Sequence, residues 1–320
     1  MNQYNVLIFA TFKPFVEEFV TEQTNALHSW KALRCNPKII ILGDEYGVKE
    51  LCEKENVIHH ETLLKTKYGT PLVSDIFEQG WKYAHDDDIC IFVNGDIILT
   101  NSLCDGLDRF VKENPDYNKQ TYMLTSIRYD WFNFRPIDFS NPDWETDINA
   151  DMKGEYALPT GIDLYIHRKN TIQNIPESGI AKFAYDGWIM GYAIANFDIT
   201  IDTTSIIKIY HQFGKWFQNR KVCERKCMSK ELTENAKNIT KIRIDDGYLK
   251  CLITDCDTKW SLIPGVNEPD NPNKLVVRYE PKVVPQEPQE PFKPRQRFQK
   301  PSLHRKPIMS QNAKRRRGIL

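Results

Sequence analysis

Short apolar runs alternate with amphipathic segments over residues 4–100. The runs are short and rich in Ile and Val, which is typical of strands buried on both faces of a sheet. The predicted strands are residues 5–10, 38–42, 56–59 and 89–93. Helices are predicted between them, one beginning near Pro14, one over residues 48–55 and one opening at Thr70-Pro71. Strands separated by helices imply a mostly parallel sheet with right-handed crossovers, and so an α/β fold.

Beyond residue 120 the pattern is mixed. Three further strands are predicted, at residues 122–127, 162–167 and 199–210, the last of them interrupted near Thr203-Thr204. Between the first two lies an aromatic and acidic stretch, residues 129–151, which has no clear periodicity. A loop this long inside a compact domain is more often functional than idle, so we expect this stretch to contribute to the function.

The composition changes abruptly at Pro264. Ten of the 18 prolines fall in residues 264–320, which also carry 13 Lys and Arg against 5 Asp and Glu. Such a segment cannot bury enough apolar surface to fold. The sequence therefore predicts one folded domain over residues 1–263 and a disordered, Pro-rich basic tail over residues 264–320.

Length and charge add little beyond this division. With 320 residues, and 43 basic residues balancing 43 acidic ones, the net charge indicates no class of partner. The apolar run at the N-terminus is too short to span a membrane and lacks the flanks of a signal peptide. We expect a soluble cytoplasmic protein without a membrane span, in which the eight cysteines are reduced.

The most informative segment is Asn94-Gly95-Asp96, directly after the strand at residues 89–93. In open α/β sheets, ligands bind beyond the carboxyl ends of the strands. Asn94 and Asp96 can face one ligand, and Gly95 would let a phosphate approach the backbone. A carboxylate here can hold a divalent cation, which in turn holds a diphosphate. The alternative is a β-turn that closes a hairpin.

This turn resembles the Asp-X-Asp motif of GT-A-fold glycosyltransferases, in the branch that writes it Asn-X-Asp. Further phrases similar to that family are residues 68–72 (YGTPL), 161–165 (GIDLY), 185–188 (YDGW) and 209–212 (IYHQ). The resemblance covers roughly residues 4–260. It implies a GT-A-like α/β fold, with a mixed central sheet flanked by helices. Asn94 departs from the usual first Asp and supplies no negative charge, so a lower metal affinity is expected.

The resemblance also implies an activity and the residues that carry it. The activity is transfer of a sugar from a nucleoside diphosphate sugar, UDP-linked, to a hydroxyl of a glycan, protein or small-molecule acceptor. Mn²⁺ or Mg²⁺ would assist as a Lewis acid. The implied roles are metal ligands at Asp96 and His211, a general base at Asp186, and donor contacts at Thr11, Thr70, Asn94, Asp96 and Asp163.

Each of these roles has a structural alternative. Asp186 could be a helix N-cap, Asp163 a solvent-facing strand residue, and His211 a rim histidine bonded to backbone. If Asp96 and His211 share a cation, their side chains should lie within about 4 to 6 Å of each other.

Other candidates have plainer readings. Residues 86–88 (DDD) are expected to form a solvated turn, and the adjacent His59 and His60 to point to opposite faces of a strand. Core packing is the expectation for the aromatic residues Trp131, Phe132, Phe134 and Trp144, with stacking on a sugar as the alternative. Cys223, Cys227, Cys251 and Cys256 are spaced loosely for zinc, and free thiols are expected instead. Residues 314–317 (KRRR) could be a nuclear localisation signal, but nucleic acid is not expected as a partner.

Two rival functions remain. One is a nucleotidyltransferase on a similar fold, and the other a non-catalytic binding protein that acts through its basic tail. The first usually has a Gly-rich phosphate loop after the first strand, whereas residues 10–14 (ATFKP) contain no glycine.

Overall fold

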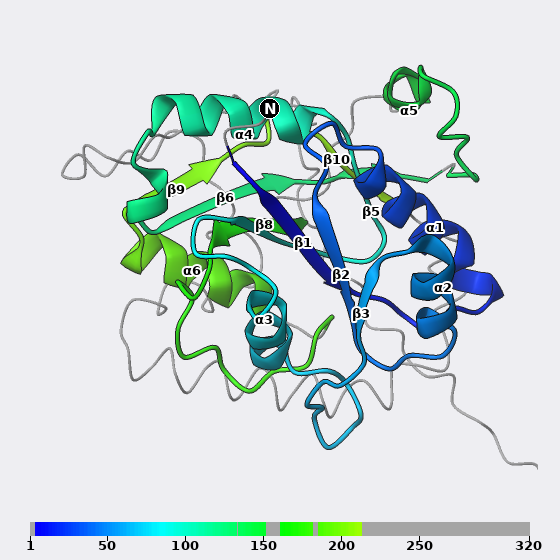
Figure 1. The fold of residues 1–320 in the computed structure, drawn as a ribbon, viewed down its shortest axis with the longest axis horizontal. Coiled ribbons are helices and arrows are strands. Elements are labelled where there is room, and N and C mark those ends of the chain that lie inside the picture. Colours follow the sequence, from blue (N-terminus) through cyan, green and yellow to red (C-terminus); the bar gives the residue numbers. More distant parts are fainter. Residues whose placement is uncertain (1–3, 133, 152–160, 182–184, 213–320) are drawn as a thin grey trace, which may run out of the picture. The chain divides into compact units, whose positions relative to one another are not determined.

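Two sheets organise the chain in its computed structural model, which describes residues 4–132, 134–151, 161–181 and 185–212 (Figure 1). The larger sheet contains β1 (Val6–Thr11), β2 (Lys38–Leu42), β3 (Ile58–His60), β4 (Ile89–Val93), β6 (Tyr122–Ile127), β8 (Ile162–Arg168) and β9 (Ile199–Asp202). Its strand order is β3-β2-β1-β4-β8-β6-β9. Strand β8 runs antiparallel to both of its neighbours, β4 and β6, whereas the other neighbouring strands are parallel. The mixed central sheet expected from the sequence is confirmed.

Helices cover both faces of this sheet. They are α1 (Glu17–Lys31), α2 (Val48–Glu55), α3 (Val73–Trp81), α4 (Ser102–Glu113) and α6 (Tyr185–Asn196). Helix α5 (Trp144–Asp151) packs instead in a separate cluster with the smaller sheet described below, and a short 3-10 helix lies at Tyr117–Lys119. Side chains alternate along β1, so Val6 and Ile8 pack with α1, α2 and α4. Leu7 and Phe9 pack on the other face with α3 and α6 (Figure 1). The sheet is thus buried on both faces, as its continuous apolar runs predict.

A smaller sheet joins distant parts of the chain. It consists of β5 (Ile97–Leu99), β7 (Tyr129–Trp131) and β10 (Ile209–Gln212), with β10 in the centre. Strand β10 is antiparallel to β5 and parallel to β7. His211 is in register with Ile97 on one side and with Asp130 on the other. This pairing brings His211 beside the turn that precedes β5.

The predicted elements agree best where apolar runs are uninterrupted. The strands at residues 38–42, 89–93 and 122–127 and the helix at residues 48–55 have the expected bounds. The strand predicted at residues 199–210 is two strands, and they pair in different sheets. Helices α4 and α5 and strand β7 were not predicted. Helix α5 and strand β7 lie in the stretch without clear periodicity.

The first helix begins later than predicted. Pro14 is not its first residue, since α1 starts at Glu17. The Phe15 N–H donates to the Tyr46 carbonyl at 2.6 Å, and Gln23 bonds both backbone groups of Lys13. These contacts hold residues 13–15 outside the helix. The expected start at Pro14 was therefore wrong by three residues.

Some expectations concern parts of the chain that lie outside the described residues. They are the domain boundary at residues 263/264, the basic tail, and the four cysteines from Cys223 to Cys256. Within the described ranges, no helix has the length and apolar character needed to cross a membrane.

Candidate functional site

The Asn94-Gly95-Asp96 turn connects β4 to β5 at the carboxyl end of β4. The Ile97 N–H donates to the Asn94 carbonyl at 3.1 Å and closes the turn. A Cβ at Gly95 would lie 2.5 Å from both the Thr11 carbonyl oxygen and the Phe12 ring. Glycine is required here because the turn rests on the end of β1. The sequence analysis assigned that space to a phosphate, but the chain itself fills it, so this part of the interpretation was wrong.

Asp96 is the point where three segments meet. The Lys13 ammonium, just after β1, donates to Asp96 Oδ2 at 2.9 Å. His211 Nε2, from β10, lies 3.7 Å from the same oxygen. The Gln212 amide donates to the Asp96 backbone carbonyl at 3.1 Å. Asp96 and His211 therefore lie at least as close as the distance expected for two ligands of one cation.

The surroundings fix the charge states of these two groups. Burial opposes ionisation of Asp96, but Lys13, His211 and Arg128 outweigh it and hold the Asp96 pKa well below its usual range. Burial lowers the pKa of His211, although Asp96 acts in the opposite direction. At neutral pH the pair is a carboxylate beside a neutral imidazole. Both are acceptable ligands for Mn²⁺.

Asn94 and Asp163 form the framework behind the turn. The Asn94 amide donates to Asp163 Oδ1 at 2.5 Å, and the Asn94 N–H donates to the Asp163 carbonyl at 3.2 Å. The Tyr185 hydroxyl donates to Asn94 Oδ1 at 3.4 Å. Arg128 forms a short ion pair with Asp163 Oδ2. Asp163 is buried, so it is not the solvent-facing residue that the alternative reading allowed.

A second carboxylate lies on the far side of the His211 ring. Asp130 Oδ1 is 3.9 Å from His211 Nδ1, and it accepts a hydrogen bond from Arg128 Nε at 3.0 Å. Arg128 thus bridges Asp130 and Asp163. The sequence analysis missed Lys13, Arg128 and Asp130. The alternation of charged residues at 128 and 130 was the one available signal for the latter two.

Asp186 lies in the first turn of α6. Its Oδ1 accepts the Gly187 N–H at 2.8 Å. Burial raises the pKa of Asp186 to about 6, and the charge of Asp163 acts in the same direction, while the Gly187 hydrogen bond opposes it. A carboxylate that titrates near neutral pH is suited to general-base work. Because Tyr185 is already part of α6, Asp186 lies inside the helix and is not its N-cap, so that alternative reading was wrong.

The two threonines differ in their placement. Thr11 ends β1, and its carbonyl faces Gly95. Thr70 precedes α3, and its carbonyl accepts the Thr66 N–H at 2.7 Å. Among the described residues, no hydrogen bond or ion pair joins Thr70 to Asp96. The structure therefore brings Thr11 to the turn, but it does not bring Thr70 into direct contact with it.

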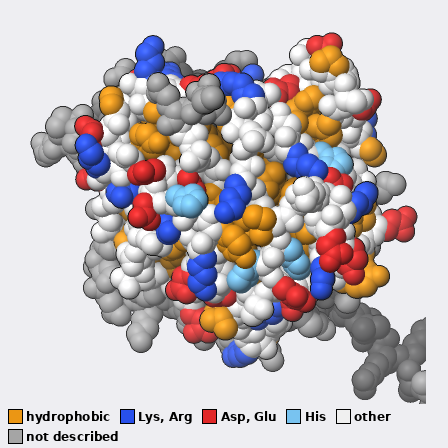
Figure 2. Space-filling view, viewed as in Figure 1, with side chains coloured by type: hydrophobic (Ala, Val, Ile, Leu, Met, Phe, Trp, Pro, Cys, Tyr) orange, Lys and Arg blue, Asp and Glu red, His pale blue; other side chains and the backbone are white. Residues whose placement is uncertain are grey.

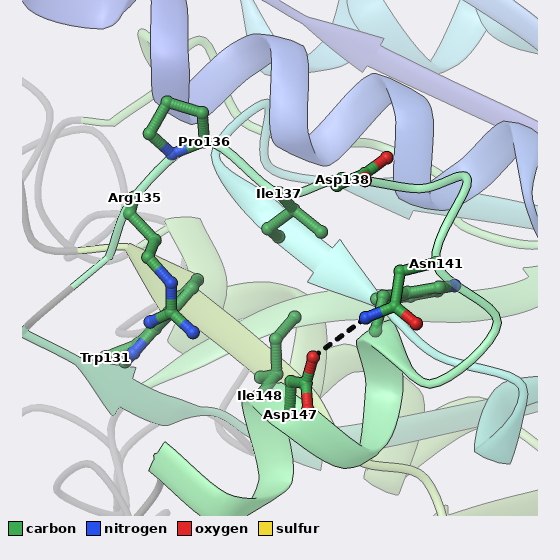
Figure 3. A pocket seen from close by; sticks show the side chains of 9 residues that line it. Trp131, Arg135, Pro136, Ile137, Asp138, Asn141, Asp147 and Ile148 are labelled. Carbon is green, nitrogen blue, oxygen red and sulfur yellow. Dashed lines mark hydrogen bonds between the residues drawn. The ribbon is translucent and has the colours of Figure 1, made fainter.

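The aromatic stretch packs mostly as a core of its own. Trp131 and Trp144 are buried in a cluster with Tyr129 and Tyr210, and Phe134 packs against it. Phe132 is 58% exposed, so core packing was the wrong expectation for that residue. A cavity of about 190 Å³ lies beside this cluster (Figure 3). Its lining includes the side chains of Trp131, Arg135, Pro136, Ile137, Asp138, Asn141, Trp144, Asp147 and Ile148.

The remaining candidates have structural partners. His59 lies 2.7 Å from the Gly43 carbonyl, and His60 lies 3.0 Å from the Tyr83 hydroxyl, so the two rings do face different neighbours. Asp88 is buried and accepts the His85 N–H at 2.8 Å, which departs from the fully solvated turn that was expected.

Potential metal ligands and surface charges are spread over the described residues. No group of three or more His, Cys, Asp or Glu side chains suited to one metal occurs in the described ranges. Figure 2 shows Lys and Arg interspersed with Asp and Glu over the viewed face.

Comparisons with known proteins give distant similarities. No protein-family model matches the sequence, and no curated protein matches it. One similar solved structure is S. aureus TarS 1–349, with 13% sequence identity, a TM-score of 0.41, and 65% of this chain and 60% of that chain covered. In complex with UDP-GlcNAc, the same TarS fragment gives 12% identity, a TM-score of 0.38 and coverages of 65% and 58%. The mannosyltransferase PcManGT from Pyrobaculum calidifontis, in complex with GDP-Man and Mn²⁺, has 11% sequence identity and a TM-score of 0.42, with 79% of this chain and 69% of that chain covered. The chain thus spans less than two thirds of the TarS fragment.

Proposed function

We propose that the chain is a metal-assisted glycosyltransferase that moves a sugar from a nucleoside diphosphate sugar, UDP-linked, to an acceptor hydroxyl. The observation that carries the proposal is the meeting of Asp96 and His211, which come from distant parts of the sequence to within 3.7 Å. They meet at the carboxyl end of β4, the edge where open α/β sheets bind ligands. The resemblance of the turn to the Asp-X-Asp motif supports the same assignment.

Asp96 and His211 would hold the cation. Their donor set fits Mn²⁺ or Mg²⁺, because a carboxylate is a hard oxygen ligand and a neutral imidazole is acceptable to Mn²⁺. Two protein ligands suffice where substrate phosphates and water supply the others. When bound, the cation supplies Lewis-acid neutralisation of the leaving diphosphate. Asp130 Oδ1 lies 3.9 Å from Nδ1 of the His211 ring, so its negative charge favours a proton on that nitrogen and leaves Nε2 for the metal.

Asp186 would act on the acceptor. Its carboxylate takes the proton of the acceptor hydroxyl, whose oxygen forms the new bond to the anomeric carbon. The bond from that carbon to the diphosphate breaks, and its electron pair leaves with the diphosphate. Asp163 does not compete for the role of base, because Arg128 and Asn94 occupy its two carboxylate oxygens.

The donor contacts follow from the positions of the remaining residues. Thr11 lies at the end of β1 beside the turn, and Asn94 lies in the turn itself. The hydrogen bonds of Asn94 to Asp163 and Tyr185 leave one amide hydrogen for a ligand. Thr70 would reach the donor only through movement of the loop before α3.

The test is a donor-hydrolysis screen across UDP- and GDP-linked sugars with Mn²⁺. Asp96→Ala should abolish metal-dependent turnover and retain the circular dichroism spectrum of the folded chain. His211→Ala should weaken the metal dependence less severely, because water can replace one ligand of several. Asp44→Ala is a matched control, since Asp44 pairs with Lys65 and is exposed.

Two results would contradict the proposal. One is donor turnover by Asp96→Ala at the wild-type rate. The other is release of pyrophosphate from a nucleoside triphosphate and a sugar phosphate, because that reaction identifies a nucleotidyltransferase.

A further inference from the structure

Lys13 occupies the position at Asp96 where a cation would bind. Its ammonium lies 2.9 Å from Asp96 Oδ2, the oxygen that also faces His211. A divalent cation shared by Asp96 and His211 needs that oxygen. An ammonium and a divalent cation repel each other at such a separation. The binding of one must therefore displace the other.

The backbone of Lys13 is fixed, whereas its side chain can move. Gln23, which is 1% exposed, accepts the Lys13 N–H at 2.5 Å and donates to the Lys13 carbonyl at 3.2 Å. The Lys13 side chain is 38% exposed, against 13% for Asp96 and 15% for His211. Its ammonium also lies 5.1 Å from the centre of the Phe19 ring, which gives a displaced cation a nearby favourable surface.

We propose that the Lys13 ammonium occupies the cation position in the free protein and moves to the donor diphosphate when the metal binds. Metal and nucleotide would therefore bind cooperatively. This inference rests on the proposed function. In the free site, the charges of Lys13 and Asp96 cancel. Arg128 is paired with Asp130 and Asp163, so Lys13, Arg128 and the three carboxylates carry a net charge of −1. A divalent cation alone would change this to +1 while the displaced ammonium stays nearby. The negative charge of a diphosphate that binds with the cation compensates the positive charges of both the metal and the displaced ammonium.

The experiment measures Mn²⁺ binding by electron paramagnetic resonance, with and without UDP or GDP. Lys13→Met removes the competing ammonium and should bind Mn²⁺ alone up to about fivefold more tightly, which is the largest factor that an exposed ion pair usually contributes. The tightening of Mn²⁺ binding by nucleotide should shrink in this variant. Coupling is reciprocal, so the tightening of UDP binding by Mn²⁺ should shrink by the same factor. Lys13→Arg should keep the coupling.

Lys31→Met is the matched control. Lys31 is 39% exposed and pairs with Glu55 at 2.8 Å, so this variant breaks an ion pair of similar exposure between α1 and α2. Its Mn²⁺ affinity and its coupling should equal those of the wild type. Thermal unfolding checks that each variant is folded, and Lys13→Gln replaces Lys13→Met if the latter does not fold.

Two results would overturn the inference. The first is equal Mn²⁺ affinity in wild type and Lys13→Met, or no Mn²⁺ binding by either. Either result would show that the Lys13 ammonium does not compete with a cation at Asp96. The second is nucleotide coupling that is unchanged in Lys13→Met, which would show that the ammonium does not reach the diphosphate. Failure of every variant to bind a nucleotide would instead refute the proposed function. The Mn²⁺-only comparison would still decide whether Lys13 competes with the cation.

Discussion

Asp96 remains ionised although it is mostly buried, because the positive charges of Lys13 and Arg128 lie close to it. The position of Asp96 depends on the neighbouring residue, Gly95, which has no side chain. Gly95 lets the turn lie against the Thr11 carbonyl and the Phe12 ring. At the scale of single residues, the site is therefore set by close packing as well as by charge.

Gly95→Ala should test that packing. The added Cβ would meet two groups at 2.5 Å, and relief requires the turn to shift. We expect a loss of about 1 to 3 kcal/mol in the free energy of unfolding, the usual range for overpacking, and weaker Mn²⁺ binding. Denaturant titration and Mn²⁺ binding measure the two effects. Gly69→Ala is the control, because an added Cβ there meets nothing within 4 Å and should cost only backbone strain at a φ of +84°. Unchanged Mn²⁺ binding in Gly95→Ala would contradict the role given to the turn.

Asp186 should set the acid limb of the pH profile of kcat. A base must be ionised, so with a pKa of about 6 the rate should fall as the pH drops below about 6. Asp186→Asn should lower kcat by about 10²- to 10⁴-fold with little change in donor affinity. Steady-state kinetics between pH 5 and 8 would check this, and a wild-type rate in the variant would retire the assignment.

The same substitution should stabilise the fold. The pKa of Asp186 is raised on folding, so its ionisation opposes folding at pH 7 and Asp186→Asn removes that cost. The gain in the free energy of unfolding is at most about 3 kcal/mol above pH 6. It should fade as the pH falls towards 4, where the carboxyl group of the folded protein is protonated. Asp198→Asn should change stability in the opposite sense, because hydrogen bonds from Thr121 lower the Asp198 pKa. Thermal melts at several pH values would separate the two signs.

The sequence predicted the principal residues but not their partners. Asp96 and His211 could be named because each follows or ends an apolar strand in a recognisable phrase. Lys13 and Arg128 could not, because a lysine after a strand and an arginine between two strands do not reveal which carboxylates they face. Their roles come from the distances that the fold creates.

At the scale of elements, α1 is joined to β10 through Asn25 and through the Glu22 carbonyl, which accepts a hydrogen bond from the Gln212 amide at 2.9 Å. Asn25 is 3% exposed, and its amide donates to Gln212 Oε1 and to the Arg135 carbonyl, both at 2.8 Å. Its Oδ1 accepts the Ile137 N–H at 3.0 Å. Since Gln212 also bonds the Asp96 carbonyl, this network connects the segment beside the cavity of Figure 3 to the candidate site.

Asn25→Ala should loosen that connection. It leaves buried groups without partners, which costs about 1 to 3 kcal/mol for each unsatisfied group. We expect a loss of at least that size in the free energy of unfolding, together with faster hydrogen exchange at the Ile137 amide. Asn196→Ala, at an exposed residue of α6, should change stability by no more than about 0.5 kcal/mol. Equal effects of the two substitutions would argue against the network.

Element types were predictable where one pattern dominated. Residues 38–42 and 89–93 are apolar throughout or nearly so, and both are strands. Strand β7 and helix α5 escaped prediction because their order comes from tertiary partners. Trp131 is held in register with Gln212, and Trp144 packs beside Tyr210. A local pattern contains no information about such contacts.

At the scale of the whole molecule, the tail should be dispensable for folding. The composition of residues 264–320 is rich in proline and basic residues and lacks apolar periodicity. A chain that ends at residue 280 should therefore melt at nearly the same temperature as the full chain in differential scanning calorimetry. Loss of a cooperative transition on truncation would show that the removed segment packs on the folded domain.

The central position of β10 has a consequence for the order of assembly during translation. In the smaller sheet β5 and β7 each pair with β10, and β10 is the last described strand to leave the ribosome. A nascent chain that ends before residue 209 can therefore form β1 to β4 and β8, but it holds Asp96 without His211 or Gln212. Under the proposed function, ligand binding would be postponed until β5 and β7 are joined by β10. Incomplete chains would then not sequester cations or nucleotides, and a bound cation would mark a chain whose synthesis has passed β10.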